Sequence, residues 1–295
     1  MNESRIASFW SAMPNNAAVC GLCPHRCHIP DNASGLCGVR ENRNGVLLAA
    51  SYGKVSSIAL DPIEKKPLNM FHPGKSILSV GGFGCNLKCQ FCQNYEISSE
   101  FGEFFKEARR MSPSDIVAIA IETLPRGNIG VAYTYNEPLI GFEFVFDCAE
   151  RIRKEGLRNV LVTNGHINKE PLHILLPLID AMNIDLKGFS DTFYQGVGGN
   201  LETVKETIAL CAGRCHVEVT TLVIPSGSNH SELGNEGDVD GIAQWLSSID
   251  PNIPLHLTRF FPRYKMNDTE ATPRETINKL CETARKHLKN VFGLH

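Results

Sequence analysis

The chain has 295 residues, of which 42% are hydrophobic and 21% charged, and its formal net charge at pH 7 is −3. This length suits one large core, or one core with a small appended module. The near balance of charge excludes the basic surface of nucleic-acid-binding proteins, so we expect no nucleic-acid partner. Because the sequence shows neither a signal peptide nor an apolar run of membrane-spanning length, we expect a cytoplasmic protein without membrane contact.

The first part of the chain is rich in cysteine. Cys20, Cys23, Cys27 and Cys37 form a C-x2-C-x3-C-x9-C run within 18 residues. In a reducing cytosol such thiols are better explained as metal ligands than as disulfides. Four thiolates suit a closed zinc site or an iron–sulfur cluster, and the spacing does not decide between the two metals. The alternative is a set of unligated buried thiols. We expect residues 1–75 to form a cysteine-rich metal-binding module.

From residue 76 onward, short β-rich segments alternate with amphipathic, helix-like segments. We expect strands at 77–80, 130–135, 160–163, 181–186, 217–224 and 255–260. We expect helices at 113–124, 141–155, 171–178, 201–211, 241–248 and 274–288. Ser112-Pro113 offers an N-cap followed by proline at the first helical position. This alternation implies parallel strands with right-handed crossovers, whose functional loops gather at the strands' carboxyl ends. The pattern alone fits a closed barrel, a doubly wound sheet or a partial barrel.

A second cysteine set follows the first of these strands. Cys85, Cys89 and Cys92 form C-x3-C-x2-C directly after the glycine-rich segment 81–84. Thiolates are soft ligands, and iron–sulfur clusters normally take four of them. Three close cysteines without a nearby fourth indicate a [4Fe–4S] cubane with one iron open to another ligand. A zinc site with a borrowed fourth ligand, or three buried thiols, would leave the glycines and Phe91 unexplained.

The pattern C-x3-C-x-aromatic-C, with Phe91 at the aromatic place, resembles the signature of the radical S-adenosylmethionine (SAM) superfamily. Further segments strengthen the resemblance: 23–27, 35–42, 61–67, 83–94 and 133–138. Together they resemble the radical SAM proteins of the AmmeMemoRadiSam system, which are related to pyruvate formate-lyase activating enzymes. The resemblance implies an α/β fold in which residues 76–295 form a partial (β/α)6, TIM-like barrel.

In that family the open iron of the [4Fe–4S] cluster binds SAM. Reductive cleavage of SAM gives a 5′-deoxyadenosyl radical, which abstracts hydrogen from a substrate. The resemblance implies the same activity here, under anaerobic conditions, with Cys85, Cys89 and Cys92 as cluster ligands. It also implies a reducing electron donor of the ferredoxin or flavodoxin type, and AMMECR1-like or Memo-like proteins as partners. The substrate, a small molecule or a protein, does not follow from the motifs.

The resemblance extends to SAM contacts at the strand ends. Glu137 matches the glutamate that receives the SAM ammonium, whereas Tyr135 and Asn136 stand where the family typically has glycines. The residues expected to contact SAM are Gly82, Phe91, Asn136, Glu137, Asn164, Asp185, Lys187 and His256. No catalytic residue is assigned.

Several of these residues have a purely structural alternative. Glu137 could be a helix-entry acid, Asp185 and Lys187 could form an internal salt bridge, and His256 could be a satisfied core histidine. At the mouth of the barrel, Arg259 could bind substrate or cap the strands.

Three functions therefore stand open. The first is a radical SAM enzyme that acts on a small molecule or a protein. The second is a glycyl-radical enzyme activase, and the third is a non-catalytic iron–sulfur protein for electron transfer or sensing. Activases usually insert extra clusters after the radical SAM cysteines, whereas here the extra cysteines come before them, which favours the first. An electron carrier would leave Glu137, Asp185 and Lys187 unexplained.

Overall fold

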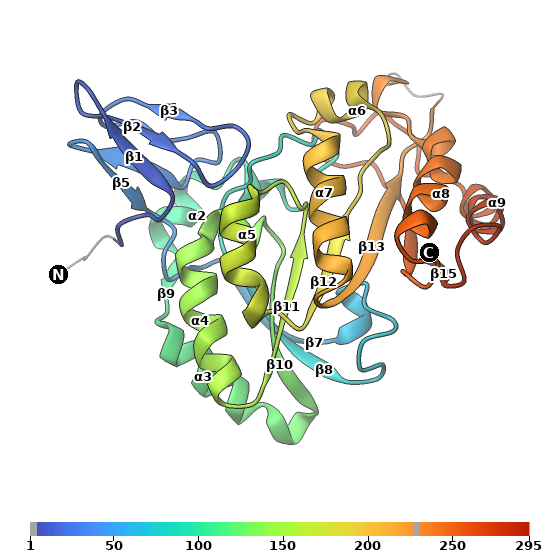
Figure 1. Cartoon of the computed structure of the whole chain (residues 1–295), viewed down its shortest axis with the longest axis horizontal. Coiled ribbons are helices and arrows are strands. Elements are labelled where there is room, and N and C mark those ends of the chain that lie inside the picture. The colour runs from blue at the N-terminus through green and yellow to red at the C-terminus, as the bar shows by residue number, and fades with distance from the viewer. Residues whose placement is uncertain (1–4, 227–230, 295) are drawn as a thin grey trace.

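Figure 1 shows a computed structural model of the chain, which describes residues 5–226 and 231–294. Its centre is an eight-stranded sheet in the order β15-β14-β13-β12-β11-β10-β8-β7. Only β7 is antiparallel to its neighbour within this sheet. The strands are β7 (Ser57–Pro62), β8 (Ser76–Gly81), β10 (Asn128–Thr134), β11 (Arg158–Thr163), β12 (Ala181–Asp185), β13 (His216–Val223), β14 (Leu255–Arg259) and β15 (Val291–Leu294).

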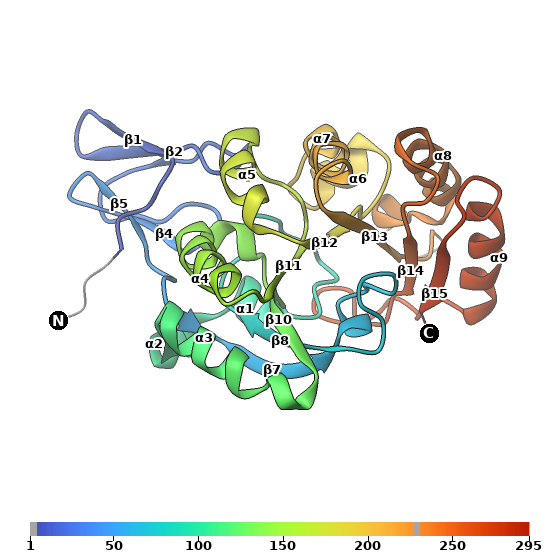
Figure 2. The same cartoon turned by 60° about the horizontal axis from the view of Figure 1, so that its bottom comes forward.

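Helices cover the outer face of this curved sheet, as Figures 1 and 2 show. They are α3 (Pro113–Glu122), α4 (Phe142–Lys154), α5 (Lys169–Leu175), α7 (Leu201–Ala212), α8 (Val239–Ile249) and α9 (Arg274–Ala284). Three shorter helices lie in loops: α1 (Tyr95–Ser98), α2 (Gly102–Glu107) and α6 (Asp191–Gly196). Within 5–226 and 231–294, every helix is too short or too polar to cross a membrane.

The expected α/β partial barrel is confirmed, with its six strands and six helices. Local signals explain several bounds. Ser112 accepts from the Asp115 amide while the Asp115 side chain accepts from the Ser112 amide, so a capping box begins α3. After α4, Gly156 has a φ of +72°, a left-handed conformation that ends helices at low steric cost. Strand β15 was not expected.

The residues before the barrel form smaller sheets. One has the order β1-β2-β3, with β1 (Trp10–Met13), β2 (Ala17–Cys20) and β3 (His28–Ile29). Another is the hairpin of β4 (Arg40–Arg43) and β5 (Val46–Ala49), which turns at Asn44 and Gly45. The short strands β6 (Lys54–Val55) and β9 (Arg109–Arg110) also pair. Because β7 joins the large sheet, that sheet begins inside the segment 1–75; the division into two domains at residue 75 stays a prediction.

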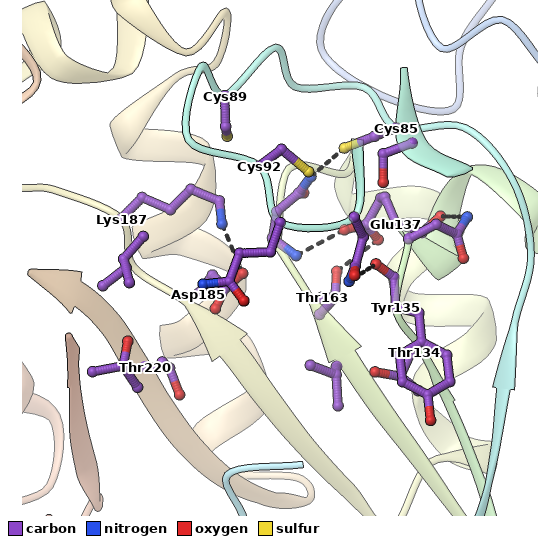
Figure 3. A pocket seen from close by; sticks show the side chains of 18 of the residues that line it. Cys85, Cys89, Cys92, Thr134, Tyr135, Glu137, Thr163, Asp185, Lys187 and Thr220 are labelled. Atoms are coloured by element: carbon purple, nitrogen blue, oxygen red, sulfur yellow. Dashed lines mark hydrogen bonds and ion pairs between the residues drawn. The ribbon is translucent and has the colours of Figure 1, made fainter. Parts of the chain in front are cut away.

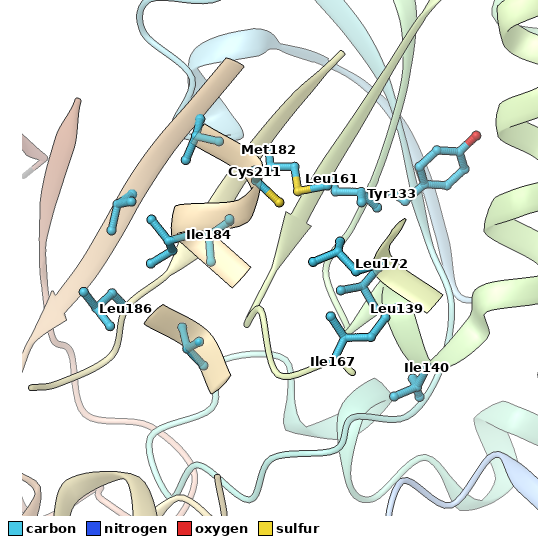
Figure 4. Packing of buried hydrophobic residues seen from close by; sticks show 14 of the residues in the cluster. Tyr133, Leu139, Ile140, Leu161, Ile167, Leu172, Met182, Ile184, Leu186 and Cys211 are labelled. Carbon is cyan, nitrogen blue, oxygen red and sulfur yellow. The ribbon is translucent and has the colours of Figure 1, made fainter. Parts of the chain in front are cut away.

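The two faces of the sheet differ in character, and this difference positions the site. On the helix-covered face, Leu161, Met182 and Ile184 are buried with Leu172 of α5 and Cys211 of α7 (Figure 4). Burying each such aliphatic side chain contributes about 1.5–3 kcal/mol. Strand alternation turns the intervening residues toward the inside of the barrel, where polar side chains gather.

Candidate functional site

A cavity of about 570 Å³ opens at the carboxyl ends of the parallel strands. Residues from the loop after β8 and from the ends of β10 to β14 line it (Figure 3). Cys85, Cys89 and Cys92 lie on one side, above Glu137 and Asp185. This is the edge where parallel α/β folds place their functional loops, as expected from the alternation of strands and helices.

The three cysteines of the loop all line this cavity. Burial raises the pKa of the Cys85 thiol, and it raises the pKa of Cys89 to about 11 although the nearby Lys187 opposes the shift. For Cys85 and Cys89 the raised pKa favours the neutral thiol until a metal displaces the proton. Among the described residues, no three His, Cys, Asp or Glu side chains converge on a single-ion site. The three cysteines border the cavity of about 570 Å³, which has room for a cluster of several atoms.

The glycine-rich turn before Cys85 is held by Asn136. Asn136 Oδ1 accepts from the Gly82 amide at 2.9 Å, and its Nδ2 donates to the Gly84 carbonyl at 3.1 Å. Gly84 has a φ of +84°, and a Cβ there would lie 2.6 Å from the Cys37 carbonyl oxygen. Asn136 lines the cavity, whereas Gly82 lies beside a neighbouring, smaller one. Asn136 thus ties the loop that carries Cys85, Cys89 and Cys92 to the end of β10.

Glu137 is buried at the floor of the cavity. Its Oε1 accepts from the Leu139 amide at 2.9 Å and from Thr163 Oγ1 at 2.7 Å, and its Oε2 accepts from the Asn164 amide at 2.7 Å. Burial raises its pKa to about 7, although these hydrogen bonds oppose the shift. A carboxylate offers about four lone-pair sites, so at least one remains for a ligand.

Asp185 and Lys187 form the salt bridge that was one alternative, with 2.7 Å between Oδ2 and Nζ. Both residues nevertheless line the cavity. Burial works against the charge of Lys187, but Asp185 and Cys89 outweigh it and raise its pKa. Asn164 also lines the cavity, and its Nδ2 lies 3.6 Å from Cys85 Sγ.

Phe91 and His256 have different positions. Phe91 is buried at the cavity and packs against Phe193 with ring centroids 6.3 Å apart. His256 is fully buried below the cavity, outside its lining, and its Nε2 lies 2.6 Å from Glu218 Oε2. Glu218 also binds His216, so His256 belongs to a His–Glu–His network inside the barrel. Its Nδ1 is buried without a hydrogen-bond partner among the described residues, so the alternative of a satisfied core histidine is met at one ring nitrogen only.

Sequence reasoning gave no role to Asp61 and Lys66, although the segment that holds them was noted. Asp61 Oδ2 accepts from Lys66 Nζ at 2.9 Å, from Ser79 Oγ at 2.9 Å and from the Tyr135 hydroxyl at 2.7 Å. Lys66 and Tyr135 line the cavity, as does Arg259. The only sequence feature that pointed to this group was an acidic segment followed by Lys65 and Lys66. Tyr135, which binds Asp61, lies 74 residues further along the chain.

The N-terminal cysteines form a separate group. Cys20, Cys23, Cys27 and Cys37 line one small cavity, together with His25. His25 Nε2 is 2.7 Å from the Asn86 carbonyl oxygen. The structure thus brings the four thiols together and places them beside the loop that carries Cys85.

The chain is similar to several known proteins. Residues 79–235 match the family model described as the radical SAM superfamily. The uncharacterized protein MJ0808 of Methanocaldococcus jannaschii is 42% identical over 98% of this chain and 84% of its own. The pyruvate formate-lyase-activating enzyme of Clostridium pasteurianum is 25% identical, over 74% of this chain and 93% of that enzyme.

Among solved structures, SuiB of Streptococcus suis, determined bound to S-adenosylmethionine, has a TM-score of 0.53 and 13% identity to this chain. The match covers 72% of this chain and 48% of SuiB, so the chain spans about half of that protein's length. At this level of identity the likeness concerns the fold alone.

Proposed function

Since the chain belongs to the radical SAM superfamily, we propose that Cys85, Cys89 and Cys92 hold a [4Fe–4S] cluster with which this enzyme cleaves SAM reductively. One observation carries the proposal: the three thiols share a cavity of about 570 Å³ with the buried carboxylate of Glu137. When bound, the cluster supplies the electron for cleavage, which yields methionine and a 5′-deoxyadenosyl radical that abstracts hydrogen from the substrate.

The polar groups of the cavity fit the charged parts of SAM. Glu137 keeps a free lone-pair site for the SAM ammonium, which it would bind through a charge-assisted hydrogen bond. Asp185 Oδ2 accepts a hydrogen bond from Lys187 Nζ, so Oδ1 is left to accept from the ribose hydroxyls of SAM. Asn164 adds an amide beside Cys85, and Phe91 gives an apolar wall.

Two of the expected SAM residues have a different role in this proposal. The Gly82 amide already donates to Asn136, and the Nε2 atom of His256 already pairs with Glu218. We therefore assign Gly82 to shaping the cluster loop and His256 to the interior of the barrel. Asn136 acts as a positioning residue for that loop.

Anaerobic reconstitution tests the activity directly. With dithionite in place of a ferredoxin- or flavodoxin-type donor, the wild-type protein should convert SAM to 5′-deoxyadenosine and methionine. Cys89→Ala should abolish this conversion, because it removes a cluster ligand. Cys215→Ala is the matched control, since Cys215 is a half-buried thiol outside the cavity lining and should keep the activity. Product formation by Cys89→Ala at the wild-type rate would reject the proposal.

A glycyl-radical enzyme activase is the second candidate, favoured by the name of the Clostridium pasteurianum relative and by how much of that enzyme the match covers. Incubation of the reduced protein and SAM with the pyruvate formate-lyase of that organism would give a glycyl-radical electron paramagnetic resonance (EPR) signal if this is correct. SAM cleavage without such a signal would favour another substrate. The AmmeMemoRadiSam assignment and its AMMECR1-like and Memo-like partners stay predictions.

A further inference from the structure

The charged side chains that line the large cavity are unequal in sign. Among the described residues, two carboxylates line it, those of Glu137 and Asp185. The cationic side chains of the lining are those of Lys65, Lys66, Lys187 and Arg259. Lys187 compensates Asp185 through the salt bridge, and the proposed function assigns Glu137 to the SAM ammonium. Every charged group of the described lining that remains without an assignment is therefore cationic.

Lys66 reaches the cavity from a segment that crosses the inside of the barrel. This segment, residues 63–75, follows the edge strand β7. Asn183 of β12 donates to the Pro67 carbonyl oxygen at 2.8 Å, and Glu218 of β13 accepts from the Asn69 amide at 3.0 Å. Only 3% of the Lys66 side chain is exposed, so its ammonium is held within the protein and not at the outer surface.

A single carboxylate is shared by the two lysines of this segment. Asp61 Oδ2 lies 2.9 Å from Lys66 Nζ, and Asp61 Oδ1 lies 3.5 Å from Lys65 Nζ. Burial lowers the pKa of Lys66, but its ion pair with Asp61 opposes this shift. One carboxylate compensates one positive charge, so the two lysines keep a surplus of one. Beside a partly buried site such a surplus attracts an anion more strongly than it would in water.

Arg259 brings a second cation to the cavity from the end of β14. Its Nε donates to the Thr272 carbonyl oxygen at 2.6 Å, and its Cζ lies 4.8 Å from the centre of the Phe261 ring. These contacts hold the guanidinium, while its terminal nitrogens have no acceptor within residues 5–226 and 231–294. A guanidinium held in this way offers a fork of N–H donors that matches a carboxylate or a phosphate.

The two cations approach the cavity from opposite ends of the sheet. The strand order places β7, which precedes Lys66, at one edge, and β14, which carries Arg259, next to the other edge. Glu137 and Asp185, the acids assigned to SAM, come from the region of β10 and β12 between these ends. The unassigned cations therefore flank the region proposed for SAM.

We infer that Lys66 and Arg259 form a subsite for the anionic group, a carboxylate or a phosphate, of a small-molecule substrate. The inference rests on the proposed function and names the substrate class of the same site. Because the Lys66 ammonium is enclosed, the anion must enter the cavity, which suits a small molecule. A glycine within a polypeptide, the target of a glycyl-radical activase, carries no charge that would meet these cations.

Titration with simple anions tests the subsite without any cleavage of SAM. Inorganic phosphate and acetate are titrated separately into reconstituted, unreduced protein by isothermal titration calorimetry at low ionic strength, where charges are least screened. At least one anion should bind saturably, to one site per chain, both with and without SAM. The anion that binds more tightly indicates whether the substrate group is a phosphate or a carboxylate. Absence of saturable binding would overturn the inference. Displacement of the anion by SAM would also overturn it, because these cations would then bind the SAM carboxylate.

Substitutions locate the bound anion. Arg259→Gln and Lys66→Gln should each weaken anion binding at least about tenfold, since each removes a charge-assisted hydrogen bond. Glutamine at position 66 keeps a donor for Asp61. Arg263→Gln is the matched control, because Arg263 is half exposed, lies outside the cavity lining and should leave the affinity at the wild-type value.

Circular dichroism establishes that each variant is folded. Arg259 is only half-buried, so Arg259→Gln tests the subsite even if Lys66→Gln does not fold. Wild-type anion affinity in either folded variant would overturn the inference. Failure of the wild type to cleave SAM would reject the proposed function instead, and the titration, which needs no cleavage, would still test the two cations.

Discussion

The Tyr135 hydroxyl donates a hydrogen bond to Asp61 Oδ2 across 2.7 Å and joins the end of β10 to the edge strand β7. Tyr135 has a φ of +72°, a left-handed conformation that costs a non-glycine residue about 1–2 kcal/mol. Lys66 pairs with the same Asp61 oxygen and lies 4.6 Å from the centre of the Tyr135 ring. The anchored side chain therefore offsets backbone strain at a place where the family typically has glycine.

Substitutions at Tyr135 test this balance. Tyr135→Gly should be about 1 kcal/mol more stable to urea than Tyr135→Ala, because glycine adopts a positive φ without a steric penalty. Tyr135→Phe should lose about 1 kcal/mol through the missing hydrogen bond. Tyr52→Phe is its matched control, since the Tyr52 hydroxyl also donates to an aspartate, at 2.6 Å, but outside the cavity. Equal stabilities of the Gly and Ala variants would contradict the strained backbone.

Glu137 should make stability depend on pH. Burial raises its pKa to about 7 in the folded protein, whereas an unfolded chain has a glutamate pKa of about 4.3. Between these values the folded state binds more protons than the unfolded state. The contribution of Glu137 to the free energy of unfolding is therefore greatest below about pH 4.3, falls as the pH rises to about 7 and is constant above.

Glu137→Gln should remove this fall. The measurement is urea unfolding of the cluster-free wild type and variant at about pH 5 and about pH 7.5, with the difference between the two proteins plotted against pH. Other titrating groups are common to both proteins, so they cancel in the difference. A difference that does not change with pH would show that Glu137 has an ordinary pKa.

We expect the salt bridge of Asp185 and Lys187 both to stabilise the fold and to bind SAM. A double-mutant cycle can separate these two roles. The side chains are 33% and 16% exposed, so their ion pair is only partly screened by water. We expect Asp185→Asn and Lys187→Met each to reduce the free energy of unfolding by about 1–3 kcal/mol, and the double variant to lose less than the sum. SAM binding to the reconstituted double variant should weaken at least tenfold. Unchanged SAM affinity would leave the pair a purely structural salt bridge.

Gly84 and Gly127 form a matched comparison. Their φ values are +84° and +82°, but a Cβ at Gly84 would lie 2.6 Å from the Cys37 carbonyl oxygen, whereas no atom lies within 4 Å of one at Gly127. Gly127→Ala should cost only the backbone strain, about 1 kcal/mol. Gly84→Ala should cost at least about 2 kcal/mol in urea unfolding, because the cysteine-rich segment must also move. Equal costs would contradict the close packing of Cys37 on the cluster loop.

Local patterns in the chain predicted the alternation of strands and helices and the loop with three cysteines, whereas the choice of a partial barrel and of radical SAM chemistry came from the resemblance to a known family. The spacing of Cys85, Cys89 and Cys92 carries over into space because the three residues share one short loop. The helix start at Ser112 and the stop at Gly156 are set by neighbours along the chain. Alternation of strands and helices was sufficient to predict a parallel sheet, since crossover connections constrain the order of its strands.

Contacts between distant segments could be read only from the folded molecule. His256 faces Glu218 because of the register between β13 and β14, and no spacing in the sequence encodes that choice. Asp61 meets Tyr135, and Asn86 bridges the two cysteine groups, only after the chain has closed over itself. Such pairs depend on which strands become neighbours and on which way each side chain points. Both are properties of packing, whereas ligand spacing within one loop is a property of the linear chain.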